Sequence, residues 1–130
     1  QVKETLEVLR NRGISLAIAS SRTSESLRDL LDRMGMESLF SCIIGAQDIV
    51  HAKPDAEPVL KILDILGFMA DETLVVGDMD VDILMGANAG AKTCGVTWGN
   101  GTRKELKEAG ADYIIDRMED LIVQVTMCLR

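Results

Sequence analysis

Residues 73–90 read Thr-Leu-Val-Val-Gly-Asp-Met-Asp-Val-Asp-Ile-Leu-Met-Gly-Ala-Asn-Ala-Gly, and this stretch decides the fold. Its first four residues, Thr73 to Val76, form a β-branched apolar run that predicts a short strand buried on both faces. Gly77 allows a sharp turn of the backbone. Small and apolar residues from Ile83 to Ala89 then predict a helix packed closely on a sheet. Between the turn and the helix, carboxylates occupy every second position: Asp78, Asp80 and Asp82.

These three acids follow a strand directly, so they are expected at the carboxyl end of a parallel sheet, where open α/β sheets bind ligands. Carboxylates that face one pocket repel each other, and a hard cation such as Mg²⁺ would relieve that repulsion. The alternative is an Asp-rich turn whose acids cap the following helix. The stretch alone leaves both interpretations open.

The composition favours a single α/β domain over residues 1–130. A chain of 130 residues is long enough for a hydrophobic core without disulfides. Apolar residues make up 47% and aromatic residues only 3%, which suits Val/Ile/Leu strands covered by helices. The formal net charge of −7 argues against nucleic acid or an anionic membrane as the main partner. A small anionic substrate remains compatible, because a local pocket can be cationic.

The three cysteines point to a reducing environment. They are odd in number, lack metal-binding spacing, and two of them lie in apolar runs: Cys42, Cys94 and Cys128. We therefore expect reduced core thiols in a cytoplasmic protein. No apolar run approaches about 20 residues, so no membrane span is expected. The first residues are charged and helical in pattern, unlike a secretory signal.

The chain alternates predicted helices and strands without a repeat or linker. We expect Thr23 to cap one helix, Pro54 to open another at its first position, and Gly67 to end it. The pattern predicts a Rossmann-like, doubly wound α/β domain with a parallel sheet and helices on both faces. The strands are expected at 14–19, 40–44, 73–76, 91–98 and 113–115.

Two further residues suggest phosphate chemistry. Ser20 ends a buried strand at the start of a helix, where its hydroxyl and free backbone N–H groups could bind a phosphate. Lys53 precedes Pro54 at another helix start, where a cation opposes the helix dipole. A lysine held there beside carboxylates suits an anionic phosphate. The alternatives are a strand-end serine without a ligand and a solvated lysine. His51, the only histidine, is expected to face solvent or to pack in a substrate loop.

Three motifs follow one another along the chain: Ala-Ser-Ser-Arg at 19–22, Lys-Pro-Asp-Ala-Glu-Pro at 53–58 and Val-Gly-Asp-Met-Asp-Val-Asp…Ala-Asn-Ala-Gly-Ala at 76–91. In this order and spacing they resemble the signatures of the haloacid dehalogenase superfamily. The chain is most similar to its phosphoglycolate phosphatase and beta-phosphoglucomutase branch, over nearly its whole length. The similarity extends to Trp98–Leu106 and Ala109–Tyr113.

The resemblance implies a role for each motif. Ser20 and Ser21 would bind the phosphoryl group, and Lys53 would neutralise both the nucleophile and the transferring phosphate. Asp78 would hold Mg²⁺, and Asp82 would support the metal directly or through water. The expected substrate is a small phosphorylated metabolite.

One element of the family pattern is missing. The nucleophile of the family is an Asp in an Asp-x-Asp motif on the first strand, and no such segment precedes Ser20. Asp78-Met79-Asp80 imitates the motif, but it follows the serine and lysine motifs and belongs to the metal site. The chain also lacks the helical cap of this branch. Either a preceding part has been left out or cleaved, which the intact remaining motifs favour, or the chain is a natural remnant.

In the family the missing strand is the central one, between the strands that lead to Ser20 and Asp78. We expect these two strands to be separated by twice the normal spacing of about 4.8 Å. Their facing backbone groups would be unpaired, at a cost of about 1–3 kcal/mol for each buried group. We expect an N-terminal fragment or a swapped partner element to fill the gap, rather than direct pairing of the two strands to close it.

The sequence therefore favours the C-terminal part of a Mg²⁺-dependent phosphatase of the haloacid dehalogenase superfamily. This part alone is expected to be inactive. In the whole enzyme an Asp would attack phosphorus, and water would hydrolyse the aspartyl-phosphate. Two alternatives remain: a phosphomutase of the same branch, and a non-catalytic domain that keeps the phosphate and metal pocket. Selectivity for the substrate looks to reside in the cap.

Overall fold

The computed structural model describes the backbone of residues 2–128 and the side chains of residues 2–125. Helices and strands alternate as predicted, with three short 3₁₀ turns between them. The strands are β1 Ala17–Ala19, β2 Cys42–Ile44, β3 Leu74–Gly77, β4 Lys92–Val96 and β5 Tyr113–Ile115. The helices are α1 Val2–Asn11, α2 Ser24–Arg33, α3 Glu57–Leu66, α4 Asp80–Asn88, α5 Arg103–Glu108 and α6 Asp120–Cys128, and the 3₁₀ turns are η1 Glu37–Leu39, η2 Ala46–Asp48 and η3 Ala70–Glu72.

Local sequence signals explain several of these boundaries. Thr23 caps α2, because its side chain accepts the N–H of Ser26, and Gly67 ends α3 in a left-handed conformation with φ of 76°. Both predictions are confirmed. Three of the predicted strands, however, are shorter in the structure, and β3 is shifted by one residue to end at Gly77.

The prediction that Pro54 opens a helix is wrong. Helix α3 begins at Glu57 with Ala56 as its N-cap, and Pro58 lies in the first turn instead. The side chain of Asp55 accepts the N–H of Glu57 at 2.8 Å, which stabilises a local turn before the helix begins. Lys53 is therefore in a loop, and not at the first turn of a helix. Ser20 likewise precedes α2 by four residues.

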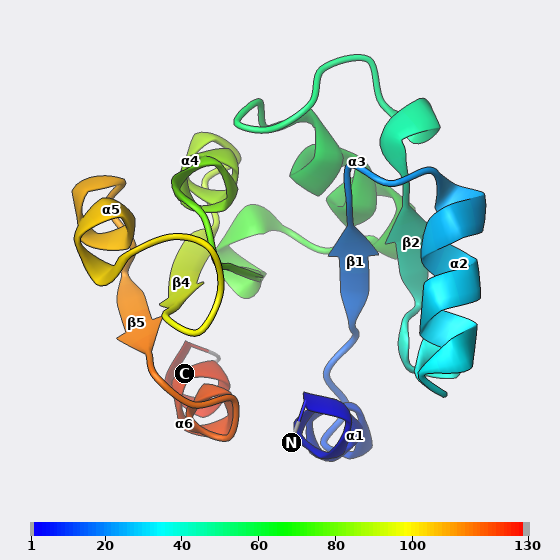
Figure 1. Cartoon of the computed structure of the whole chain (residues 1–130), viewed down its shortest axis with the longest axis horizontal. Coiled ribbons are helices and arrows are strands. Elements are labelled where there is room, and N and C mark those ends of the chain that lie inside the picture. Colours follow the sequence, from blue (N-terminus) through cyan, green and yellow to red (C-terminus); the bar gives the residue numbers. More distant parts are fainter. Residues whose placement is uncertain (1, 129–130) are drawn as a thin grey trace.

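The strands form two separate parallel sheets. β1 pairs with β2, and β3, β4 and β5 pair in that order. Helices cover both faces, as predicted: α4 contacts α3 and α5 above the strands, and α1 contacts α6 below them (Figure 1). The predicted α/β class with parallel pairing is thus confirmed.

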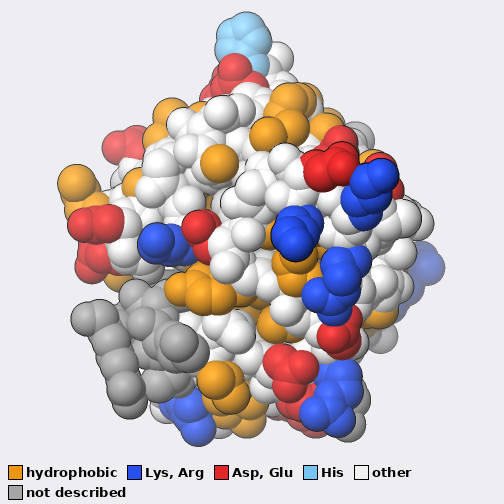
Figure 2. Space-filling model, turned by 90° about the vertical axis from the view of Figure 1, so that its left-hand side faces the viewer, with side chains coloured by type: hydrophobic (Ala, Val, Ile, Leu, Met, Phe, Trp, Pro, Cys, Tyr) orange, Lys and Arg blue, Asp and Glu red, His pale blue; other side chains and the backbone are white. Residues whose placement is uncertain are grey.

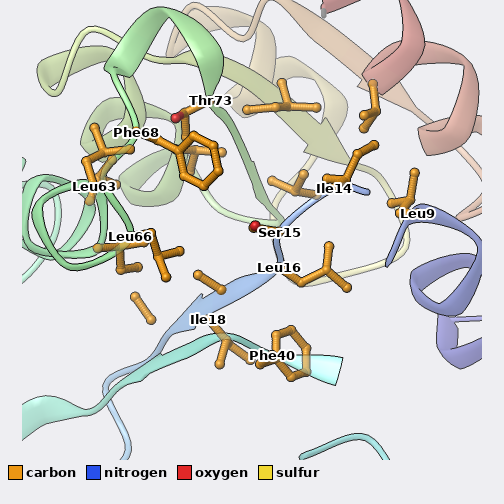
Figure 3. A pocket seen from close by; sticks show the side chains of 18 of the residues that line it. Leu9, Ile14, Ser15, Leu16, Ile18, Phe40, Leu63, Leu66, Phe68 and Thr73 are labelled. Atoms are coloured by element: carbon orange, nitrogen blue, oxygen red, sulfur yellow. The ribbon is translucent and has the colours of Figure 1, made fainter. Parts of the chain in front are cut away.

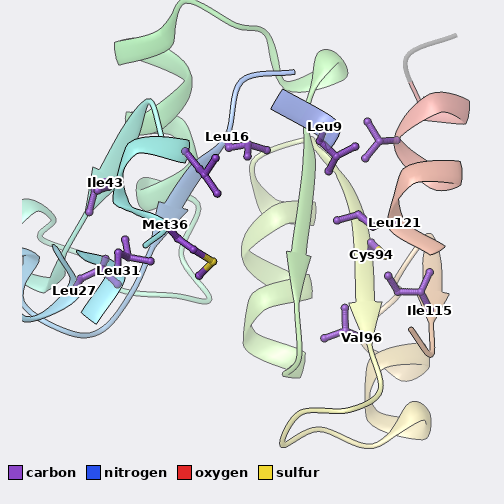
Figure 4. Close-up of a cluster of buried hydrophobic side chains, with 12 residues drawn as sticks. Leu9, Leu16, Leu27, Leu31, Met36, Ile43, Cys94, Val96, Ile115 and Leu121 are labelled. Carbon is purple, nitrogen blue, oxygen red and sulfur yellow. The ribbon is translucent and has the colours of Figure 1, made fainter. Parts of the chain in front are cut away.

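The largest cluster of buried side chains extends across both sheets. Figure 4 shows it running from β1 and β2 to β4, β5 and α6. Its members include Leu9, Leu16, Leu27, Leu31, Met36, Ile43, Cys94, Val96, Ile115 and Leu121. Cys42 and Cys94 are free and buried, as expected of core thiols. The side chain of Cys128 lies outside the described residues.

The strands differ in burial: β1 and β3 are less buried than β2 and β4, the strands with which they pair. β2 is buried throughout, and β4 is buried except at its first residue. β1 is only partly buried, and in β3 the side chain of Val76 is 40% exposed. The prediction that residues 73–76 are buried on both faces is therefore wrong.

A cavity of about 410 Å³ occupies the space between β1 and β3. We call it the slot: residues 13–19 line one side and residues 72–76 the other. Apolar side chains from α1, α3 and the segment before β1 point into it, including Leu9, Ile14, Leu16, Leu63 and Leu66 (Figure 3). Within residues 2–128, no hydrogen bond joins β1 to β3. The two strands do not pair directly, as predicted.

None of the described helices combines the length and the apolar character that crossing a bilayer requires. On the face in Figure 2, positive and negative side chains are interspersed and do not gather into a patch of one sign.

Candidate functional site

An ion pair between Lys53 and Asp82 lies at one end of the slot. Lys53 Nζ donates to Asp82 Oδ1 at 2.6 Å, and the two side chains are 30% and 10% exposed. Lys53 lies in the loop after β2, whereas Asp82 lies in the first turn of α4, directly after β3. The pair therefore brings together the carboxyl ends of the two sheets. Because both groups are largely withdrawn from water, their attraction is screened less than that of a surface pair.

Asp82 is held from two sides. Its Oδ2 accepts the N–H of Met79 at 3.1 Å, which caps α4, while Oδ1 binds Lys53. Gly77 allows this arrangement, because a Cβ at that position would lie 2.2 Å from Asp82 Cβ. The glycine is thus needed for close approach, in addition to any turn. Both oxygens of Asp82 are occupied by protein donors.

Asp78 contacts the loop that follows β4. Its Oδ2 accepts the N–H of Asn100 at 2.9 Å, and its carbonyl oxygen accepts the N–H of Gly101 at 2.9 Å. Within residues 2–128, no hydrogen bond is made to its second carboxylate oxygen, Oδ1. This oxygen is therefore available to a ligand.

Asp80 takes no part in the site. Its Oδ1 accepts the N–H of Val81 at 2.8 Å, at the start of α4. The three acids of the Asp-rich stretch thus have different hydrogen-bond partners. Helix capping accounts for Asp80 and for one oxygen of Asp82, as the second interpretation of the stretch expects. Metal binding by the stretch stays a prediction.

Ser20 and Ser21 follow the end of β1. Ser20 N–H donates to Ile44 O at 3.1 Å, and Ser20 Oγ accepts the N–H of Arg22 at 3.1 Å. Ser21 is exposed. No hydrogen bond in residues 2–128 links either serine to Lys53, Asp78 or Asp82. Their predicted binding of phosphate stays a prediction.

Glu57 organises the loop that carries Lys53. One of its carboxylate oxygens accepts the N–H of Val50 at 2.7 Å, and the other accepts the N–H of His51 at 2.9 Å. These two backbone hydrogen bonds hold the pKa of Glu57 below its usual value. His51 itself is exposed, as expected. Glu57 therefore fixes the loop rather than contributing to chemistry.

A magnesium ion would fit Asp78 only in part. The free carboxylate oxygen is a suitable hard ligand, since Mg²⁺ is usually held by one or two carboxylates together with waters and substrate phosphate. The described residues contain no group of three or more His, Cys, Asp or Glu side chains placed to hold a metal. Asp78 could thus hold the ion with ligands from outside this chain, and Asp82 would support it through the ordered turn.

Sequence reasoning missed the contribution of Glu57 and of the Gly99-Asn100-Gly101 loop. The contact of this loop with Asp78 joins residues more than 20 positions apart. The only local signal was the pair of glycines. Glu57 lies inside a recognised motif, yet nothing in its spacing indicates that its carboxylate binds backwards to the preceding loop.

Comparison with known proteins identifies the family to which the chain belongs. Residues 1–96 match the family of haloacid dehalogenase-like hydrolases. The chain is 40% identical over 124 residues to the pyrophosphatase PpaX of Oceanobacillus iheyensis, covering 95% of this chain and 58% of that protein. It is 35% identical over 122 residues to a phosphoglycolate phosphatase of Aquifex aeolicus, covering 94% of this chain and 56% of that protein.

A solved structure agrees with the fold. The crystal structure of a predicted phosphoglycolate phosphatase from Haemophilus somnus superimposes with a TM-score of 0.89 and 30% identity, covering 96% of this chain and 55% of that one. This chain thus spans little more than half the length of the relatives that it matches. It belongs to the haloacid dehalogenase-like hydrolases, in the branch of the PpaX pyrophosphatases, phosphoglycolate phosphatases and beta-phosphoglucomutases.

Proposed function

We propose that this chain is the C-terminal part of the core of a Mg²⁺-dependent phosphatase that acts on a small phosphorylated metabolite. The observation that carries the proposal is the partly buried Lys53–Asp82 ion pair at the end of the slot, with Asp78 directly after β3 on the same segment as Asp82. A cation and a carboxylate with a free oxygen are there placed at the carboxyl ends of parallel strands, where such sheets bind ligands. The names of the relatives suggest pyrophosphate and phosphoglycolate as first substrates to test.

We further propose that an extended apolar strand fills the slot, supplied by an N-terminal segment of the protein or by a partner chain. The slot has apolar walls, and a strand on each side has its facing edge unpaired. A strand between β1 and β3 would satisfy both edges and join the two sheets into one. Such a strand would also end beside Lys53 and Asp82, because Asp82 lines the slot.

The proposed reaction then assigns a task to each residue. A carboxylate at the end of the inserted strand attacks phosphorus, the bond from phosphorus to the leaving oxygen breaks, and water later cleaves the acyl phosphate. Lys53 stabilises the negative charge on the nucleophile and on the transferring phosphoryl oxygens. Asp82 orients the Lys53 ammonium. Asp78 would bind Mg²⁺, which supplies electrostatic stabilisation of the phosphoryl group. Ser20 and Ser21 would donate to the phosphate.

The free, buried thiols of Cys42 and Cys94 support a reducing, cytoplasmic location for this enzyme.

The test compares this chain with the full-length product of its gene, which the proposal expects to be longer. Both are assayed for release of inorganic phosphate from p-nitrophenyl phosphate, phosphoglycolate and pyrophosphate, with Mg²⁺ and with a chelator. We expect Mg²⁺-dependent hydrolysis by the longer protein and none by this chain. An upstream Asp-x-Asp segment after an apolar run would support the enzyme. A gene product without that segment, and without hydrolysis, would instead indicate a non-catalytic binding domain. Transfer of the phosphoryl group to a sugar hydroxyl in place of water would indicate a phosphomutase.

A further inference from the structure

Two consecutive backbone N–H groups of the loop after β4 form hydrogen bonds with Asp78. The N–H of Asn100 donates to the carboxylate of Asp78, and the N–H of Gly101 donates to its carbonyl oxygen, both at 2.9 Å. One hydrogen bond thus fixes the side chain and the other fixes the main chain of the same residue. A turn that merely reverses the chain direction needs neither contact.

The glycines on either side of Asn100 are required for this approach. A Cβ at Gly99 would lie 2.3 Å from Asp78 Cβ and 2.4 Å from Oδ2. A Cβ at Gly101 would lie 2.3 Å from Asp78 O. Neither glycine has a positive φ, so the reason for glycine is the close contact and not the backbone conformation. Both glycines make space for the same residue.

We propose that Gly99, Asn100 and Gly101 form a positioning loop for Asp78. Because Oδ2 is bound to the Asn100 amide, the carboxylate is held in one orientation, with Oδ1 left to a divalent cation. An ordered ligand loses less conformational freedom when the metal binds. Partners that orient a metal ligand in this way typically contribute about 10- to 100-fold in metal affinity. The inference rests on the proposed function, in which Asp78 is the metal ligand of this chain.

Two substitutions of Asn100 test whether its backbone N–H, rather than its side chain, positions Asp78. Asn100→Pro removes the N–H that donates to Asp78, whereas Asn100→Ala keeps it and changes only an exposed side chain. Gly99→Ala is the second disruptive variant, because its Cβ would displace the Asp78 carboxylate. Asp78→Asn serves as the benchmark for loss of the metal ligand. All variants are made in the longer gene product, and thermal melts verify that they are folded.

The measurement is Mn²⁺ binding, followed by the electron paramagnetic resonance signal of the free ion, which needs no turnover. We expect Asn100→Pro and Gly99→Ala to raise the Mn²⁺ dissociation constant by about 10-fold or more, and Asn100→Ala to stay within about 2-fold of wild type. If Asp78→Asn abolishes binding while both disruptive variants bind like wild type, the positioning loop is refuted and the proposed function stands. If Asp78→Asn itself binds like wild type, the proposed metal site fails, and this inference fails with it. Should one disruptive variant not fold, the other decides.

Discussion

The polar site and the slot beneath it differ in how complete they are. In the polar site, formed by Lys53, Asp78 and Asp82, each side chain already has a partner within the chain. In the slot, by contrast, two strands have unpaired facing edges, and apolar walls surround an open cavity. The orientation of the polar residues is therefore encoded locally, in the loops and helix starts of this chain. Among the described residues no strand covers these walls, and in our proposal the strand that covers them carries the attacking group.

The largest expected effect tests the polar site. In the longer protein, Lys53→Ala should lower kcat by about 100- to 1,000-fold, because it removes a positive charge aimed at the transferring phosphoryl group. Steady-state kinetics with p-nitrophenyl phosphate would measure this. Lys104→Ala is the matched control, since that side chain is 84% exposed on α5, and it should stay within about 2-fold of wild type. A similarly small effect for Lys53→Ala would show that the ion pair is only structural.

The second prediction tests the slot. A soluble peptide of about eight apolar, β-branched residues with a lysine tail should bind this chain and raise its free energy of unfolding. At 100 times the dissociation constant the increase should be about 2.7 kcal/mol, measured by urea unfolding. Amide NMR shifts should change in Ala17–Ala19 and Leu74–Gly77. The same peptide with two central prolines cannot form the ladder and should not bind. Shifts confined to β5, an outer edge strand, would contradict the slot as the site.

The third prediction contrasts the open slot with tight packing on the other side of β3. Gly86 in α4 faces the three-stranded sheet, where a Cβ would lie 2.7 Å from Thr93 Cγ2 and 2.9 Å from Val75 Cβ. Gly86→Ala should therefore lower the free energy of unfolding by about 1–3 kcal/mol, as overpacking does. In an exposed helix the same change would be stabilising by about 1 kcal/mol. The sign of the change in the free energy of unfolding therefore shows whether position 86 is tightly packed. As a control, Ala87→Ser, at an exposed position of the same helix, should change the free energy of unfolding by no more than about 0.5 kcal/mol.

The smallest expected effect concerns pH and the loop that carries Lys53. The pKa of Glu57 is lowered in the folded state by the N–H groups of Val50 and His51. The stabilisation is thus complete above the unfolded pKa of about 4.3 and is lost as the pH falls through the folded pKa. Glu57→Gln should flatten the decline of stability below about pH 4.3, measured by urea unfolding. Glu108→Gln, at an exposed residue of α5, should leave the decline unchanged. If the free energy of unfolding declines equally steeply with falling pH in wild type and Glu57→Gln, the contribution of Glu57 to this decline is refuted.

Much of the architecture was predictable from local patterns. The element order, the cap at Thr23 and the end of α3 at Gly67 follow from periodicity and capping residues. The start of α3 was not, because Lys-Pro-Asp-Ala-Glu-Pro contains two prolines, and only the hydrogen bond from Glu57 N–H to Asp55 shows which one lies inside the helix. The sequence shows which residues are compatible with the first turn of a helix, but it does not show at which of several compatible residues the helix begins.

The sequence suggested residues for the candidate site but not the contacts between them. The pairing of Lys53 with Asp82 and the grip of Asn100 on Asp78 join distant segments, and no local spacing encodes them. The exposure of Val76 has a similar origin. An apolar sequence indicates a strand that is normally covered on both faces. Whether it is covered depends on neighbouring segments, which the sequence of the strand itself does not specify.

The division of the backbone into two hydrogen-bonded ladders has a consequence for the order of folding. Ala17 pairs with Cys42, Leu74 with Lys92, and Cys94 with Tyr113, so each ladder closes over no more than 25 residues of chain. Short closures of this kind form quickly, and each ladder can open as its own cooperative unit. Native-state hydrogen exchange should then give β1–β2 and β3–β5 distinct opening free energies. Binding of a strand in the slot should make the two sheets open together with a single free energy. The inserted strand would then make unfolding of the whole domain cooperative.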